Sequence, residues 1–180
     1  MELLLHICCA VCLIYPLKVL KEKKFQVKGF FYNPNIHPFS EYRKRKEAFG
    51  SLDKNMNLEI YFEQYLPQEF FRTINFHEET KQRCSLCWQL RLEKTAEFAC
   101  KNNFKYFSTT LLVSPYQDHF LIKEIGERIA RDKGISFYYE DFRKGFKEAH
   151  QEAKQKGIYC QNYCGCIYSE LERWKHSEKP

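Results

Sequence analysis

The chain has 180 residues, 44% hydrophobic and 29% charged, which is ordinary for a globular protein and predicts a single domain over residues 1–180. No apolar run approaches the length of a membrane span, and the start MELLLHI carries an acidic residue, so we expect a cytoplasmic protein without a signal peptide. The net charge of +6 permits a polyanionic partner such as a nucleic acid without requiring one.

Short apolar runs alternate with longer amphipathic ones along the chain. The pattern predicts a strand at residues 2–7, a helix at 14–24, a strand at 26–32, a helix at 40–52 with Ser40 as its N-cap, and a strand at 58–62. A long helix at 84–102, a strand at 106–113, a helix at 120–134 with Gly134 as its C-cap, a strand at 135–140, a helix from 141 to 157 and a short last helix follow. This alternation implies right-handed βαβ units, so we predict a Rossmann-like α/β fold with a mostly parallel sheet and helices on both faces.

Unusual residues stand where the predicted strands end. Cys8 and Cys9 follow the first strand, NPNIHP the second, SPYQDH the fourth and DFRKG the fifth. Parallel α/β sheets bind their ligands beyond the carboxyl ends of the strands, so these segments predict the functional site. The sequence contains neither a G-x-G-x-x-G nor a Walker loop, and cysteines occupy the first strand–helix turn instead.

Seven of the nine cysteines form three clusters: CCAVC at 8–12, RCSLC at 83–87 and YCGC at 163–166. In a reducing cytoplasm such clusters hold metal or carry redox chemistry more often than they form disulfides. Cys84 and Cys87, at i and i+3, are expected to direct both sulfurs one way, with pKa values lowered by the start of a helix. Thiolates from distant segments suit either a 4Fe–4S cluster or a tetrahedral zinc ion. We expect Cys100, on the apolar face of its helix, to be an inert buried thiol.

Cys164 and Cys166 are separated by a single glycine. This spacing is one residue tighter than a C-x-x-C redox pair, although Gly165 allows an unusual backbone, so a strained reversible disulfide is one interpretation. Ligation of a metal by both sulfurs is the other interpretation. The spacing by itself does not choose between them.

Six motifs together resemble the QueH family of epoxyqueuosine reductases. They are LLLHICCAVC, GFFYNPNIHPFSEY, RCSLCWQLRLEKTA, TTLLVSPYQDH, EDFRKGF and YCGCIYSE, and they occur in the family's order from Leu3 to about Glu170. The resemblance implies a single QueH-like domain that reduces the epoxide of epoxyqueuosine, at the wobble position of tRNA, to queuosine. It also implies a 4Fe–4S cluster with a second, mononuclear iron beside it, and an external electron donor of the ferredoxin or flavodoxin kind.

The resemblance also suggests roles for individual cysteines. It makes Cys8, Cys9, Cys84 and Cys87 the expected cluster ligands, and makes Cys164 and Cys166 either a redox pair or, with Asp141 of EDFRKG, ligands of the second iron. Cys12 completes the first motif without an assigned role. Two departures from the family pattern are Val11, where the family usually has proline, and Cys160, which lies outside the clusters.

Two histidines and one basic run are further candidates. His6 lies in the first predicted strand, which favours a core histidine or a donor to a cluster sulfur over a proton donor. His37, in the loop NPNIHP, suits a site role and a structural role equally. The run from Arg43 to Lys46 is usually a solvated helix face. Beside aromatic and amide residues it becomes a candidate contact for the anticodon arm, made by Tyr32, Asn33, Arg43, Lys44 and Arg45.

Two other functions fit parts of the sequence. A zinc-stabilised RNA-binding module would use four of the cysteines as structural ligands. A sulfur-transferring tRNA-modifying enzyme of the PP-loop kind would need a phosphate-binding glycine loop after the first strand, and the sequence has none there. Because four ligands satisfy a structural zinc ion, the surplus of clustered cysteines favours a redox centre.

Overall fold

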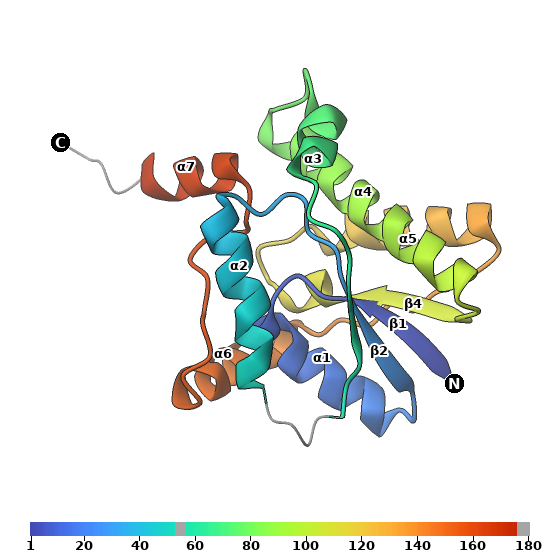
Figure 1. Cartoon of the computed structure of the whole chain (residues 1–180). Coiled ribbons are helices and arrows are strands. Elements are labelled where there is room, and N and C mark those ends of the chain that lie inside the picture. Colours follow the sequence, from blue (N-terminus) through green and yellow to red (C-terminus); the bar gives the residue numbers. More distant parts are fainter. Residues whose placement is uncertain (53–56, 176–180) are drawn as a thin grey trace.

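A computed structural model of the chain describes residues 1–52 and 57–175 (Figure 1). Within them, five parallel strands form one sheet in the order β3-β2-β1-β4-β5. The strands are β1 (Glu2–His6), β2 (Gln26–Phe31), β3 (Ile60–Phe62), β4 (Tyr106–Thr109) and β5 (Ser136–Phe137). The α-helices are α1 (Ala10–Glu22), α2 (Phe39–Glu47), α3 (Pro67–Ile74), α4 (Thr80–Lys101), α5 (His119–Lys133), α6 (Phe146–Gln155) and α7 (Ile167–Lys175). The predicted Rossmann-like α/β class is confirmed.

The central strand β1 lies between β2 and β4, with Leu3 paired to Val27 on one side and to Tyr106 on the other. Helices α1 and α6 pack together on one face of the sheet, and α4 and α5 pack together on the other (Figure 1). Leu3, Leu4 and Leu5 are therefore fully buried, as expected for a strand covered on both faces.

Two glycines meet specific requirements of this packing. A Cβ atom at Gly145 would lie 1.9 Å from Cγ of Tyr15, so the residue before α6 approaches α1 as closely as the absence of a side chain allows. Gly134 caps α5 with a φ of +66°, as the sequence predicts. Within the described part of the chain, no helix has the length and apolar character that crossing a membrane would need.

Several element boundaries differ from the predicted ones, and two of these differences affect the site. Helix α1 begins at Ala10 rather than residue 14, and α4 begins at Thr80 rather than residue 84. The proposed N-cap Ser40 lies inside α2, which follows Pro38 without a side-chain cap. The strand expected to reach residue 113 ends at Thr109 and continues as a 3-10 turn, and α3 was not predicted. Cysteines and short polar segments carry weak helix signals, so the apolar periodicity of the sequence did not predict these helix starts.

Candidate metal centre at the carboxyl edge of the sheet

Three thiols meet directly after β1. Cys9 is the N-cap of α1, and Cys12 lies on the first turn of that helix. The sulfurs of Cys8, Cys9 and Cys12, called here the Cys8 group, all lie within 4.8 Å of one another. Cys9 and Cys12 are buried, whereas Cys8 is partly exposed. The early start of α1 therefore brings Cys12, which had no assigned role, into the same site as its two neighbours.

Hydrogen-bond donors surround the sulfurs of the Cys8 group. The hydroxyl of Thr110 donates to Sγ of Cys8 at 3.3 Å, and the backbone N–H of Cys12 donates to Sγ of Cys9 at 3.4 Å. The side-chain amide of Gln161 donates to Sγ of Cys9 at 2.9 Å. The N-terminus of α1 adds a positive partial charge at the same place. All of these contacts stabilise negative charge on sulfur, which a metal ligand carries.

The three thiols of the Cys8 group differ in acidity. Hydrogen bonds from Cys12 and Cys9 hold the pKa of Cys8 well below its usual value. Burial raises the pKa of Cys9, and the hydrogen bond to Cys8 raises that of Cys12. Three adjacent sulfurs resist simultaneous ionisation because like charges repel in a poorly solvated site. A bound cation removes this obstacle, so the group is suited to hold one.

A second set of four thiols comes from α4 and from the segment before α7. Cys87 and Cys166 pack with Phe70 and Ile74 in a small apolar cluster. Burial raises the pKa of Cys84 to about 11 and that of Cys87 to about 12, and in both cases negative charge at Cys164 and Cys166 raises it further. The four thiols, called here the Cys84 group, therefore lie within electrostatic range of one another.

The prediction that a helix start lowers the pKa of Cys84 and Cys87 was wrong. Helix α4 begins at Thr80, so both thiols lie beyond its first turn, where the partial charge of the helix end has fallen off. Burial then dominates and disfavours the thiolate. Cys100 also differs from its prediction, since it is exposed rather than buried.

One cavity of about 510 Å³ joins the two groups. Its lining includes Cys8 and Cys12 from the first group and Cys164 from the second. The buried guanidinium groups of Arg45 and Arg91 line the same cavity. The first and third cysteine motifs, which are far apart in the sequence, therefore meet at one cavity, and Arg91 of α4 lines it as well.

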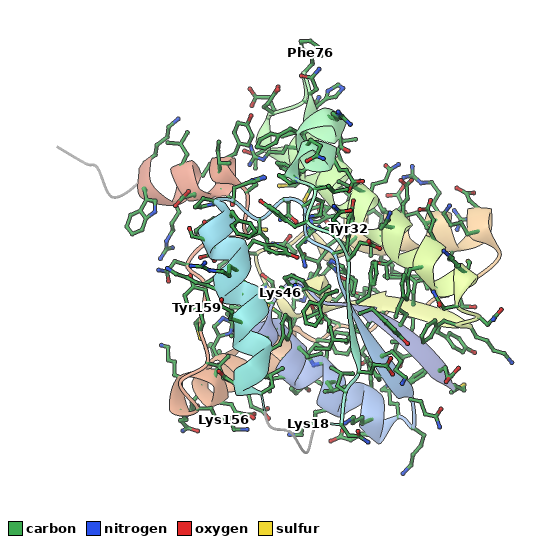
Figure 2. All side chains as sticks on the ribbon, viewed as in Figure 1. Lys18, Tyr32, Lys46, Phe76, Lys156 and Tyr159 are labelled. Atoms are coloured by element: carbon green, nitrogen blue, oxygen red, sulfur yellow. The ribbon has the colours of Figure 1, made fainter. Side chains whose placement is uncertain are left out.

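A buried ion pair fixes the segment that carries Cys164. Nε of Arg45 lies 2.7 Å from a carboxylate oxygen of Glu41, and the other oxygen of that carboxylate accepts from the Tyr159 hydroxyl at 2.6 Å. Nη1 of Arg45 donates to the carbonyl of Cys164 at 2.8 Å, and Nη2 donates to that of Tyr163 at 3.0 Å. Tyr159 lies beside α2 in Figure 2. Arg45 thus connects α2 to the segment before α7.

The structure buries three of the five residues that we expected to contact tRNA. Arg45 is 1% exposed and already fully bonded, so it is unavailable to a phosphate. Tyr32 lies at the end of β2 with its hydroxyl donating to Glu69 at 2.6 Å (Figure 2), and the Asn33 amide donates to the carbonyl of Ile7 at 2.8 Å. Both side chains are buried. Two members of the set remain on the surface, Arg43 and Lys44.

The two candidate histidines are buried and neutral. Nδ1 of His6 lies 2.9 Å from the Thr109 hydroxyl and Nε2 lies 3.2 Å from the carbonyl of Tyr32, and burial lowers the pKa of His6 to about 3. The ring of His37 stacks on Phe71, and burial lowers its pKa to about 4. The backbone N–H of His37 donates to the carbonyl of Gly165 at 2.8 Å. His37 therefore contacts the YCGC segment through its backbone.

Asp141 lies in a different network from the cysteines. Its carboxylate accepts from Nη2 of Arg143 at 2.5 Å, which lowers its pKa to about 2, and lies 3.8 Å from Nδ1 of His119. Among the described residues, the Cys8 group is the only set of three or more candidate metal ligands that gathers within 4.8 Å. The carboxylate that lines the cavity is instead Glu172, which accepts from Arg83 at 2.7 Å.

Sequence reasoning missed three residues that surround the sulfurs. Thr110 and Gln161 are common polar residues in predicted loop segments, and only their positions in space give them a role. The sequence could have indicated a role for Arg91, because it stands four residues after Cys87 on the same face of α4.

Comparisons with known proteins match almost the whole chain. A family model described as "Epoxyqueuosine reductase QueH" matches residues 3–172. Relatives of the same description are 38% identical in Dehalococcoides mccartyi, covering 99% of this chain and 98% of the relative, and 39% identical in Thermotoga maritima, covering 97% and 94%. A solved structure, described as a predicted subunit of a tRNA methyltransferase from Methanocaldococcus jannaschii, superposes with a TM-score of 0.54 over 86% of this chain and 76% of that chain. Its 12% identity supports a likeness in fold only.

Proposed function

Because this chain belongs to the QueH family of epoxyqueuosine reductases, oxidoreductases of queuosine biosynthesis, we propose that it reduces epoxyqueuosine in tRNA to queuosine at a thiol-bound iron centre. The observation that carries the proposal is the meeting of Cys8, Cys12 and Cys164 in one cavity at the carboxyl edge of the sheet.

The Cys8 group fits a single metal ion. Two thiolates on one tetrahedral ion, with metal–sulfur bonds of about 2.3 Å, stand about 3.8 Å apart. The sulfurs of Cys8 and Cys9 are 3.9 Å apart, and Cys12 completes a set of three within 4.8 Å. A set of three protein ligands leaves a coordination position open, as catalytic metal sites require. We therefore propose that this group holds the mononuclear iron.

The Cys84 group fits a larger cofactor. Its four thiols influence one another electrostatically, yet no three of them lie within 4.8 Å of one another. A four-iron cluster is bigger than one ion and takes four thiolates that stand further apart. We propose that Cys84, Cys87, Cys164 and Cys166 hold the 4Fe–4S cluster. The assignment that the sequence resemblance implied, with Cys8 and Cys9 as cluster ligands, is the alternative.

Serine substitutions separate these two assignments. If Cys12 binds the mononuclear iron, Cys12→Ser loses about one iron per chain and keeps its acid-labile sulfide. If Cys166 binds the cluster, Cys166→Ser loses most of its iron together with the sulfide. Retention of sulfide in Cys166→Ser, together with its loss in a Cys8→Ser or Cys9→Ser variant, would support the alternative assignment.

The reaction removes the epoxide oxygen as water and leaves an alkene, which takes two electrons and two protons. When bound, the cluster supplies electrons singly and the adjacent iron supplies a Lewis acid, and an external donor of the ferredoxin or flavodoxin kind reloads the site. His150 is the histidine that lines the cavity. Its Nδ1 donates to the carbonyl of Phe146 at 2.9 Å, which leaves Nε2 to exchange a proton with the substrate. We assign His150, rather than His6 or His37, to proton transfer.

The cavity has the dimensions and lining that a modified nucleoside needs. Its volume of about 510 Å³ lies within the usual range of ligand sites, roughly 300–1,000 Å³. Tyr116 lines it, is 84% exposed, and meets Phe146 edge to face at 5.8 Å. Unpaired anticodon bases stack on such aromatic side chains when they leave the loop. Gln117 and Gln161 place amide groups in the same cavity to bond the polar edge of a base.

Anaerobic purification followed by a turnover assay tests the proposed function. We expect brown protein whose broad visible absorbance is bleached by dithionite, and conversion of epoxyqueuosine to queuosine in tRNA under reducing conditions. Colourless protein that contains one zinc ion per chain and converts no substrate would contradict the proposal and favour a zinc-stabilised RNA-binding module.

A further inference from the structure

We propose that Arg91 is the buried counter-charge of the sulfur site, a positioning residue that makes the iron–sulfur cluster easier to reduce. This inference rests on the proposed function and adds a determinant of its redox chemistry. The observation behind it is the fully buried guanidinium of Arg91, which lies beside the cysteines and has no carboxylate partner among the described residues.

The contacts of Arg91 are few and neutral. Its side chain is 1% exposed. Nε donates to the carbonyl of Cys87 at 3.2 Å, and Nη1 donates to the side-chain carbonyl of Asn33 at 3.4 Å. Nη2 is buried and has no hydrogen-bond partner among the described residues. The guanidinium is therefore held in place by its neighbours, but none of these contacts neutralises its charge.

Two other buried arginines have their charge neutralised by a carboxylate, as is usual for a buried cation. Arg45 pairs with Glu41 at 2.7 Å, and Arg83 pairs with Glu172 at 2.7 Å. No carboxylate of the described residues comes within 4.0 Å of Arg91. Removing a charge from water costs more than two weak neutral hydrogen bonds return, so a buried cation requires an anion nearby. At Arg91 that anion has to come from something other than an acidic side chain.

The sulfur atoms provide the missing negative charge. Arg91 stands one helical turn after Cys87 on α4, lines the cavity beside Cys8 and Cys164, and interacts electrostatically with all three. Four thiolates and their cluster carry net negative charge, and reduction adds one more electron to it. A fixed positive charge in a poorly solvated site stabilises the reduced form more than the oxidised form. Arg91 therefore shifts the cluster toward reduction through its charge.

A redox titration of the iron-loaded protein tests this role. Arg91→Gln removes the charge but keeps N–H donors, Arg91→Lys keeps the charge, and Arg128→Gln removes an exposed charge from α5 as a matched control. We expect Arg91→Gln to lower the reduced-to-oxidised ratio at a fixed potential at least tenfold, which for one electron corresponds to a midpoint about 59 mV more negative. Arg91→Lys and Arg128→Gln should stay within threefold of the wild type.

The remaining outcomes also decide the question. A wild-type midpoint in Arg91→Gln with full iron and sulfide would overturn the inference. If Arg91→Gln fails to retain the cluster, Arg91→Lys discriminates: restored iron and sulfide support a role for charge, and loss of both in a chain with native far-ultraviolet circular dichroism overturns it. A wild-type protein without dithionite-reducible absorbance would overturn the proposed function as a whole, whereas equal midpoints in coloured proteins would overturn the role of Arg91 alone.

Discussion

Replacing Arg45 with methionine tests how the YCGC segment is held in the site. The substitution keeps a long side chain and a good helix former on α2. It removes the 2.7 Å ion pair with Glu41 and the hydrogen bonds to the carbonyls of Cys164 and Tyr163. Glu41 then remains buried with Tyr159 as its remaining hydrogen-bond donor among the contacts seen in the wild type. A buried charge without its partner is strongly destabilising.

The size of the effect follows from the burial of both partners. Removing one member of a buried ion pair costs about 3–5 kcal/mol. With a urea dependence of about 2 kcal/mol per molar, the midpoint of unfolding should fall by about 1.5–2.5 M. Urea denaturation followed by far-ultraviolet circular dichroism measures this shift. Glu41→Gln offers a milder test, because it removes the negative charge while keeping an acceptor for Arg45.

Two variants control this prediction. Arg43→Met changes an exposed residue on the same helix that lies 3.6 Å from Glu47, and should cost less than about 0.5 kcal/mol. The double change Arg45→Met with Glu41→Leu removes both buried charges and should recover part of the stability. If Arg45→Met costs no more than Arg43→Met, the buried ion pair does not stabilise the segment and the reasoning is wrong.

Three further predictions concern the cluster, the tRNA and a histidine. Cys84→Ala should lose iron, sulfide and turnover, whereas Cys100→Ala, which changes an exposed cysteine, should keep all three. If Cys84→Ala keeps all three, Cys84 is not a ligand of the cluster. Replacing Arg43 and Lys44 with glutamate should reduce the salt dependence of tRNA binding by about 0.7–0.9 for each phosphate that is no longer neutralised, without changing the iron content, and an unchanged slope would refute the contact. Burial lowers the pKa of His37 to about 4, so between pH 6.5 and pH 4 the unfolded chain binds a proton that the folded chain does not. The free energy of unfolding should therefore decrease by up to about 3 kcal/mol as the pH is lowered through this window. Urea denaturation at several pH values should show a weaker pH dependence of this free energy for His37→Phe than for the wild type, and equal pH dependences would contradict the argument.

Most of the fold was predictable from local pattern. The three buried leucines of β1, the alternation of strands with amphipathic helices, and the glycine that caps α5 are all short-range signals. Connection rules then leave a parallel sheet as the natural arrangement. The same logic placed the first cysteines at the carboxyl edge of β1, where the structure has them. Helix starts were predicted less well, because four residues before Cys84 and four before Ile14 carry no clear apolar periodicity.

The candidate site was predictable only in its composition. The motifs identified Cys8, Cys9, Cys84, Cys87, Cys164 and Cys166 as residues of interest, and the structure brings Cys8 and Cys164 to one cavity and Cys87 and Cys166 to one apolar cluster. The grouping that we propose depends on Cys12 joining Cys8 and Cys9, and this follows from the early start of α1. The pairing of Asp141 with Arg143 was likewise visible only in the structure.

The sequence by itself determined the family, the class of fold and the kinds of side chain at the site, because motif order and apolar periodicity are properties of the chain read locally. Only the tertiary structure decided the state of each charged group. Arg43 and Arg45 belong to one basic run, yet Arg43 is exposed while Arg45 is buried against a carbonyl 119 residues away. Desolvation and the pairing of charges depend on which distant segments meet, and residue order along the chain does not show that.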